Sequence, residues 1–293
     1  MIIDTFPFSE DFNALEIRYE ELKDVVDFFI ASESLYSHSG RPKLLHLQNA
    51  EKLKKKMGKQ LIVLSNTKSY LTRNPRTREM LQRQEITKYL RGLNLSPETV
   101  IIHSDCDEIP RAEKVLELAK SKNPINVLFE FDFYANYLNA KSGKWYRARA
   151  ISNSLFDSVQ QMRADVFIYF ANGTRRHNLP VMRLTDFWSS KRFPFYKFPE
   201  RISVPKLQIV KNAGWHFNNL LSEDQIMAKI INSSHTELSR ELSLERASYH
   251  YRNACDVWTG EEYKIVQIDT SFPKCVRENL DRWKDFIYES KQA

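Results

Sequence analysis

The chain has 293 residues, of which 42% are hydrophobic and 28% charged, and its formal net charge is +7. This length and composition are those of a folded protein with a large core, and they exclude a disordered or fibrous chain. The basic balance favours an anionic partner, such as a nucleotide diphosphate, an anionic surface or nucleic acid. No run of about 18 apolar residues occurs, so we expect no transmembrane segment.

Cysteine usage and the amino terminus indicate where the protein works. Three scattered cysteines are too few for a disulfide framework or a zinc site, which favours a reducing compartment. The segment Met1–Phe8 carries an acid and lacks a long apolar stretch, so we expect no signal peptide and a cytoplasmic location. The densest basic run, Lys52–Lys59, is typical of a solvated helix face.

Short apolar runs alternate with amphipathic stretches, which predicts β-α units around a mostly parallel central sheet flanked by helices. In chain order we predict a strand at Ile2–Ile3, a helix at Asn13–Val25, strands at Val26–Ala31 and Gln60–Leu64, a helix at Pro75–Arg91, a strand at Thr99–His103, a helix at Arg111–Lys120, partner strands at Val127–Tyr134 and Trp145–Ile151, and helices at Asp224–Ser233, Leu238–Ala254 and Val276–Tyr288. Prolines interrupt the pattern between Phe156 and Val204. Because no linker or repeat occurs, we expect one domain over residues 1–293.

The clearest chemical signal is the hexapeptide Asp105–Pro110 (Asp-Cys-Asp-Glu-Ile-Pro). An Asp-x-Asp pair alone arises by chance in a chain of this length. Here, however, a strand delivers Asp105 and Asp107 to the carboxyl edge of the predicted sheet, where open α/β folds bind ligands. Two carboxylates pointing the same way in an extended segment are hard ligands for Mn²⁺ or Mg²⁺ and leave positions for diphosphate oxygens. The alternative is an acidic turn that caps the following helix.

A second pattern is the alternation Phe-Glu-Phe-Asp-Phe at Phe129–Phe133. In a strand the three phenylalanines face the core, while Glu130 and Asp132 share the opposite face. Two aligned carboxylates supply a general base for an acceptor hydroxyl, or else they belong to a solvated strand face.

Two further segments carry candidate binding residues. In Asn212–Phe217, Gly214 permits close approach of a backbone or ligand and Trp215 offers a plane for sugar stacking. His216 in the same segment is a metal ligand, an acid–base group or a structural histidine.

The second of these segments, Glu33–Lys43, follows the second predicted strand. Glu33 is placed to accept a hydrogen bond from a base or ribose, and Arg41 and Lys43 to neutralise phosphates. The alternative is a charged surface loop.

Several segments along nearly the whole chain match, in the same order, the sequence motifs of one protein family. They are Ile3–Phe6, Leu15–Arg18, Glu33–Ser34 with Gly40–Lys43, Arg78–Glu79 with Gln82–Arg83, Asp105–Pro110, Asp132–Tyr134 with Leu138–Asn139, Ala213–Phe217 and Phe272–Trp283. In this order they resemble glycosyltransferase family 17, whose best-known members are the β-1,4-mannosyl-glycoprotein 4-β-N-acetylglucosaminyltransferases. Cys106 stands where the family pattern has valine.

The resemblance implies a GT-A-type nucleotide-diphosphosugar transferase fold, UDP-N-acetylglucosamine as donor, a glycan or glycoconjugate acceptor, and inversion at the anomeric carbon. It implies that Asp105 and Asp107 hold the metal, Mn²⁺ or Mg²⁺, and the diphosphate, with His216 as a further metal ligand. The animal enzymes carry an amino-terminal membrane anchor and stem, whereas we expect this chain to begin directly at the catalytic domain. We therefore expect a bacterial or viral setting with a different acceptor, such as another glycan or a glycolipid.

The resemblance also suggests which residues contact the donor and which carboxylate is the base. The expected donor-binding residues besides Asp105 are Glu33, Arg41, Lys43 and Arg83. Inversion requires a carboxylate base opposite the leaving diphosphate. We assign this role to Asp132, with Glu130 and Glu223 as the next candidates.

Two other classes of protein share parts of these patterns. A haloacid-dehalogenase-like phosphatase also uses Asp-x-Asp after a strand, but it places Thr or Val where this chain has Ile109, and no later paired-Asp motif follows. A basic nucleic-acid-binding protein would gather its basic and aromatic residues into a module, whereas here they are spread, so we expect no nucleic acid partner.

Overall fold

The structure is a computed structural model that describes residues 1–67, 74–163, 207–232 and 243–289. The strands are β1 (Ile2–Pro7), β2 (Phe28–Ser34), β3 (Leu61–Asn66), β4 (Val100–His103), β5 (Glu108–Pro110), β6 (Asn126–Ala135), β7 (Ala140–Trp145), β8 (Arg149–Ser152), β9 (Gln208–Asn218) and β10 (Lys264–Ile265). The helices are α1 (Phe12–Leu22), α2 (Glu51–Met57), α3 (Pro75–Arg91), α4 (Ala112–Ala119), α7 (Glu223–Asn232), α8 (Leu244–Arg252), α9 (Lys274–Arg277) and α10 (Leu280–Trp283), with 3-10 turns η1 (Gly58–Gln60), η2 (Asn153–Leu155) and η4 (Lys284–Phe286).

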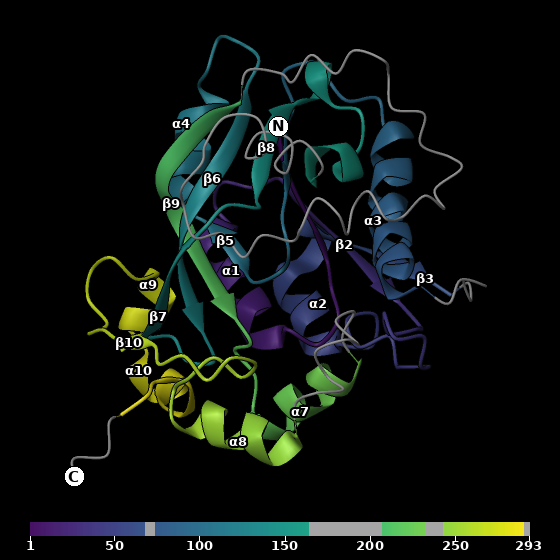
Figure 1. The fold of residues 1–293 in the computed structure, drawn as a ribbon. Coiled ribbons are helices and arrows are strands. Elements are labelled where there is room, and N and C mark those ends of the chain that lie inside the picture. The colour runs from purple at the N-terminus through teal and green to yellow at the C-terminus, as the bar shows by residue number, and fades with distance from the viewer. Residues whose placement is uncertain (68–73, 164–206, 233–242, 290–293) are drawn as a thin grey trace.

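The strands form one sheet with α3 beside β2 and β3 and with α7 and α8 gathered beyond its lower edge (Figure 1). The main strand order is β10-β7-β6-β8-β4-β1-β2-β3, and β9 pairs with both β5 and β6. The pairs β1–β2, β1–β4, β2–β3 and β6–β9 are parallel, and the other described pairs are antiparallel. The α/β class is confirmed, but the sheet is mixed and not mostly parallel.

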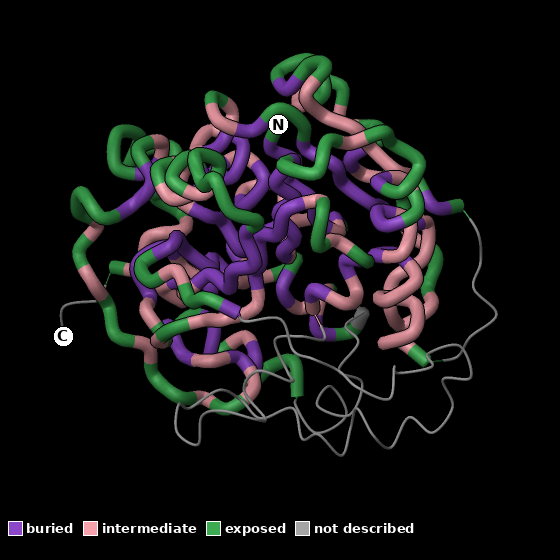
Figure 2. The backbone as a smooth tube through the Cα atoms, turned by 90° about the horizontal axis from the view of Figure 1, so that it is seen from above, coloured by how far each residue is buried: buried purple, intermediate pink, exposed green. Residues whose placement is uncertain are grey.

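The parallel strands are covered by helices on both faces. Successive side chains of a strand point to opposite faces, so each strand contributes to two apolar clusters. One face packs against α1 and α2 through a cluster that includes Ile2, Phe29, Ile102, Leu15 and Met57. The other packs against α3 through a cluster that includes Ile3, Ile30, Ile101, Ile86 and Leu90. The buried backbone accordingly runs through the middle of the molecule, between exposed loops (Figure 2).

Most predicted elements are present. The helix predicted over Pro75–Arg91 has those bounds, because the Asn74 carboxamide caps its first turn and Pro75 suits that turn. The partner strand predicted at Trp145–Ile151 is not one continuous strand, since β7 ends at Trp145 and β8 begins at Arg149, but both of these strands pair with β6 as expected of a partner. The helix predicted at Val276–Tyr288 is wrong, since the chain forms two short helices and a 3-10 turn there.

Other predictions are tested only in part. Residues 164–204 of the proline-rich stretch lie outside the described residues, as do 238–242 of the predicted helix at 238–254 and the last residue of the one at 224–233. Within the part of the chain that is described, no helix has the length and apolar character needed to cross a bilayer.

A buried arginine joins α1 and β1 to the loop after β4. Arg18 and Asp4 are fully buried, and Nε and Nη2 of the guanidinium donate to the two Asp4 carboxylate oxygens at 2.6 and 2.5 Å. Nη1 donates to the carbonyl oxygens of Asp105, Cys106 and Glu108 at 3.0, 3.3 and 2.8 Å. Burial opposes the charge of Arg18, but Asp4 outweighs burial and raises its pKa. One side chain therefore fixes the backbone path of the acidic loop.

Strand β9 approaches β5 most closely at Gly214, which pairs with Pro110. The φ angle of Gly214 is +154°, and a Cβ at this position would lie 2.0 Å from the Ile109 carbonyl oxygen and 2.9 Å from the Pro110 Cα. The expectation that this glycine admits close approach of a neighbour is confirmed. The neighbour is the backbone of the strand that follows the acidic loop.

We expect Gly214→Ala to lower the free energy of unfolding more than Gly143→Ala, as measured by urea denaturation. Both glycines have φ of +154°, but a Cβ at Gly143 meets nothing within 4 Å. The shared backbone strain costs about 1–3 kcal/mol. The clash at Gly214 adds about 1–3 kcal/mol, as for an overpacked core. Equal losses in the two variants would contradict this account of the β5–β9 contact.

We expect Arg18→Met to lower the free energy of unfolding by about 3–5 kcal/mol, because it leaves the Asp4 carboxylate buried without a partner. The control is Glu16→Gln on the same helix. Glu16 forms an exposed ion pair with Arg282 at 2.8 Å, so its loss should cost less than about 1 kcal/mol. Urea denaturation of both variants tests the difference, and similar losses would show that the buried pair has no special role.

Candidate active site

The first half of the acidic hexapeptide forms a tight turn after β4, and its second half, Glu108–Pro110, is β5. The Glu108 amide donates to the Asp105 carbonyl at 3.0 Å, and the Asp105 amide donates to the Glu108 carboxylate at 2.9 Å. The Phe217 amide donates to the Asp107 carbonyl at 2.9 Å, which joins the turn to β9. The expectation of an extended segment is therefore wrong, and the two aspartates have different partners.

Asp105 lies between two arginines. One carboxylate oxygen accepts from Arg83 at 2.8 Å and the other from Arg163 at 2.9 Å. Arg83 also pairs with Glu79, one turn before it on α3, at 2.8 Å. Burial would raise the pKa of Asp105, but Arg163 and Arg83 outweigh burial and hold the pKa well below its usual range. Asp105 is thus ionised, and both of its oxygens have cationic partners.

Asp107 faces His216 of β9. The distance from Asp107 Oδ1 to His216 Nε2 is 3.5 Å, and both residues are buried. Burial opposes ionisation of Asp107, but His216 and then Lys229 outweigh it and lower its pKa. A carboxylate oxygen and an imidazole nitrogen at this separation fit two neighbouring ligands of one Mn²⁺ or Mg²⁺ ion. In the described chain, no group of three or more His, Cys, Asp or Glu side chains is arranged to hold a metal ion, so the Asp107–His216 pair supplies two protein ligands at most.

Glu108 connects the acidic turn to a group of aromatic rings. Its carboxylate accepts from the Trp145 indole Nε1–H at 2.6 Å, and burial together with the charge of Asp105 raises its pKa. The half-buried Trp145 ring lies 4.6 Å from the His216 ring and 5.3 Å from the Phe133 ring. Phe133 stacks on His216 at 4.8 Å with an interplanar angle of 12°. These rings form an aromatic wall beside the Asp107–His216 pair.

A second carboxylate and a lysine border the turn on its other side. Asp11, in the loop before α1, pairs with Lys229 of α7 at 3.2 Å, and their side chains are 17% and 40% exposed. Burial raises the pKa of Asp11 against the opposing charge of Lys229, and Asp107 adds to the rise. The buried Cys106 thiol contacts the Asp11 carbonyl at 3.9 Å, and burial raises the pKa of this thiol well above its usual value.

The structure does not bring the expected base to this cluster. Asp132 pairs with Lys141 at 2.7 Å and with Lys144 at 3.1 Å, and Glu130 pairs with the same Lys144 at 3.3 Å. The expectation that the two carboxylates share a face of β6 is therefore confirmed. Because side chains alternate along a strand, this face is opposite to the one where Phe133 meets His216. Glu223 lies on α7 and pairs with Arg252 of α8 at 2.8 Å.

The expected donor-binding residues divide into two groups. Arg83 lies in the cluster around the acidic turn. Within the described residues, no hydrogen bond or ion pair joins Glu33, Arg41 or Lys43 to that cluster. Glu33 is fully buried and its oxygens accept the amides of residues 46–48 at 2.5–3.2 Å, so it holds the loop after β2. Lys43 lies 3.8 Å from Glu33, and burial lowers the pKa of Lys43. Arg41 is exposed.

Trp215 does not offer a surface to a sugar. It is 2% exposed, its indole N–H donates to the Ser271 carbonyl at 3.1 Å, and the Arg111 guanidinium lies 4.0 Å from its ring centroid. Its neighbour in β9, Gly214, brings the backbone of β5 against it. The ring that borders the candidate site is that of Trp145.

Sequence reasoning missed several residues that the fold brings to the turn. Asp11, Trp145, Arg163 and Lys229 come from distant segments, and a side chain that meets its partner only through tertiary structure has no local signal. Arg18 and Glu108 were within reach, because both lie in the quoted family segments. The residue type alone does not show that an arginine will be buried and will bind several backbone carbonyls.

Comparison with known proteins agrees with this arrangement. Residues 1–148 match the model of a family described as glycosyltransferase family 17, which is just over half of the chain. No curated protein matches the chain significantly. The matched half contains Arg18, Arg83 and the acidic turn, while β9 with His216 lies beyond it. The chain therefore belongs to glycosyltransferase family 17.

Proposed function

We propose that the chain transfers N-acetylglucosamine from UDP-N-acetylglucosamine to a hydroxyl of a glycan or glycoconjugate acceptor, with inversion at the anomeric carbon. The family supports sugar transfer from a donor to an acceptor. The observation that supports the finer proposal is the Asp107–His216 pair, set beside an aspartate that two arginines contact. The phosphatase and nucleic-acid alternatives find no support in the family match.

A divalent cation belongs to this proposal. Asp107 and His216 would hold the Mn²⁺ or Mg²⁺ ion, and diphosphate oxygens and water would complete its ligands. When bound, such an ion neutralises charge on the donor diphosphate. Both oxygens of Asp105 contact arginines in this structure, so its expected role as a metal ligand stays a prediction.

The cations around the turn suit a departing diphosphate. Arg163 pairs with Asp105 of the acidic turn, and Lys229 pairs with the neighbouring Asp11. Charge-assisted hydrogen bonds from such groups to phosphate oxygens stabilise negative charge that develops on a leaving group. The aromatic wall of Trp145 and Phe133 would exclude water and offer an apolar surface to a sugar ring.

In the transfer step, the acceptor hydroxyl oxygen bonds to the anomeric carbon while the bond from that carbon to the diphosphate oxygen breaks. The nucleoside diphosphate leaves with the bonding electron pair, and the hydroxyl proton passes to a carboxylate base. The Asp11 and Asp132 side chains are equally exposed, at 17%, but Asp11 lies near Asp107 and pairs with one lysine, whereas Asp132 is held by two lysines on the opposite face of β6. We therefore assign the base to Asp11 in preference to Asp132.

We expect Asp107→Ala to reduce UDP release from UDP-N-acetylglucosamine in the presence of Mn²⁺ by a factor on the order of 100 or more, because it removes a ligand of the cation that stabilises the leaving group. Stabilisation of the fold by UDP with Mn²⁺, seen as a thermal shift, should disappear as well. The control is Glu223→Gln, which removes a carboxylate that pairs with Arg252. Wild-type UDP release by the Asp107 variant would refute the proposed site.

We expect Asp11→Asn to lower kcat of transfer by about 10²–10⁴-fold, as loss of a general base does, with little change in the KM for donor. Asparagine keeps the shape of Asp11 and can still accept a hydrogen bond from Lys229. Asp132→Asn is the matched comparison and should retain most of the activity. The reverse result, with Asp132→Asn inactive and Asp11→Asn active, would restore Asp132 as the base.

A further inference from the structure

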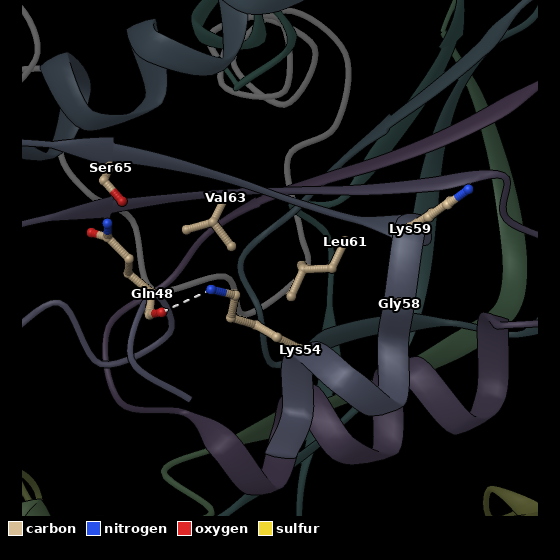
Figure 3. A pocket seen from close by; sticks show the side chains of 7 residues that line it. All are labelled: Gln48, Lys54, Gly58, Lys59, Leu61, Val63 and Ser65. Carbon is tan, nitrogen blue, oxygen red and sulfur yellow. Dashed lines mark hydrogen bonds between the residues drawn. The ribbon is translucent and has the colours of Figure 1, made fainter. Parts of the chain in front are cut away.

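A cavity of about 460 Å³ lies at the outer edge of the sheet, between β3 and α2 (Figure 3). The residues that line it are Gln48, Lys54, Gly58, Lys59, Leu61, Val63 and Ser65. Its volume lies within the range of about 300–1,000 Å³ that is typical of ligand pockets. Because β3 ends the main path of the sheet, the cavity opens at the sheet edge and does not share residues with the candidate active site.

The cavity has an apolar floor and a polar end. Leu61, Val63 and Ser65 alternate along β3, so they share the face that looks toward α2, and Figure 3 shows the two apolar side chains pointing into the space. The Ser65 hydroxyl and the Gln48 carboxamide lie together at one end (Figure 3). An apolar strip with hydroxyl and amide groups at its end suits one face and the hydroxyls of a sugar ring.

The charge around the cavity is positive. The Lys54 ammonium donates to the Gln48 carbonyl at 3.1 Å, which holds it beside the polar end. Lys56 on the same helix is neutralised by Glu20 at 2.6 Å. In the described chain neither Lys54 nor Lys59 has a carboxylate within ion-pair distance, and no carboxylate lines the cavity. Of these two lysines, Lys54 holds its ammonium beside the polar end of the cavity, whereas the Lys59 side chain points away from it (Figure 3).

We propose that this cavity binds an anionic saccharide, a sugar ring that carries a carboxylate or a phosphate, as a remote part of the acceptor. Lys54 would bind the anionic group, Leu61 and Val63 the apolar face of the ring, and Ser65 and Gln48 its hydroxyls. Strand β3 is three strands from β4, which is about 14 Å at the usual strand spacing. An acceptor of a few sugars therefore spans from the cavity to the acidic turn. The acceptor role rests on the proposed function, but the binding itself does not.

The test is a titration of the isotope-labelled protein followed by NMR. The probes are methyl β-D-glucuronide for the carboxylate, glucose 6-phosphate for the phosphate, and methyl β-D-glucoside as the neutral sugar. Shifts at the amides of Gly58 and Ser65 report the cavity, and shifts at the amide of Asp107 report the active site. We expect at least one anionic probe to shift the cavity amides with an affinity about tenfold or more above that of the neutral glucoside.

Variants separate a specific site from general attraction to a basic helix. Lys54→Gln should weaken binding of the anionic probe several-fold, and Lys59→Gln should weaken it less, because the Lys59 side chain points away from the polar end (Figure 3). Lys55→Gln, an exposed lysine of the same helix that does not line the cavity, should leave binding unchanged. Ser65→Trp should block the cavity, because Ser65 is exposed and its side chain lies at the polar end.

Two results overturn the proposal: no shift of the cavity amides by either anionic probe, or an equal loss of binding in the Lys54 and Lys55 variants. Binding that is specific for the glucuronide assigns the site to a carboxylate sugar, and binding that is specific for the phosphate assigns it to a sugar phosphate. Cavity binding in a protein that releases no UDP would refute the proposed function alone. Normal UDP release without cavity binding would remove only this site.

Discussion

The bidentate contact between Asp4 and Arg18 has no exposed surface, and the geometry of the acidic turn depends on it. Asp4 comes from strand β1 and Arg18 from helix α1, which covers it, so the pair joins the first two elements of the chain. The remaining guanidinium donors reach three backbone carbonyls of the turn. A charge buried in this way is tolerated because each of its donors has an acceptor. The turn therefore has one backbone path, and its carboxylates are presented to fixed partners.

This backbone path places Asp105 and Asp107 in different surroundings. Asp105 faces α3 and meets arginines, which keep it ionised and hold cationic groups close to the turn. Asp107 faces β9 and meets an imidazole in a buried, partly aromatic setting. The Asp-x-Asp motif thus places one carboxylate among positive charges and the other beside an imidazole nitrogen. The position of the intervening Cys106, buried against Asp11, separates the two environments.

Much of the fold could be predicted, because the apolar runs of β1, β2 and β4 and the capped helix α3 carry local signals that tertiary structure did not override. The antiparallel half could not, because β7 and β8 are short and the turn between them has no glycine or proline to mark it. In the site, the residues of the turn and His216 stood out by type and spacing. Asp132 and Trp215 stood out equally, yet the fold holds one between lysines and buries the other under Arg111. Residue type shows what a side chain can do, and only its neighbours decide whether it does so.

The pairing of β9 with β5 and β6 affects the order in which this enzyme becomes complete. Phe133 and His216 lie opposite each other in the sheet but about eighty residues apart along the chain, and contacts of such long separation form slowly. During synthesis the amino-terminal elements emerge and fold first. A nascent chain that has released β1 to β7 therefore already has the acidic turn and its arginine anchor, but it lacks the imidazole and the lysine of α7. The chain therefore acquires His216 and Lys229, together with the strand β9 that pairs with β5 and β6, only late in synthesis, so an incomplete molecule carries the family's motif without these two partners.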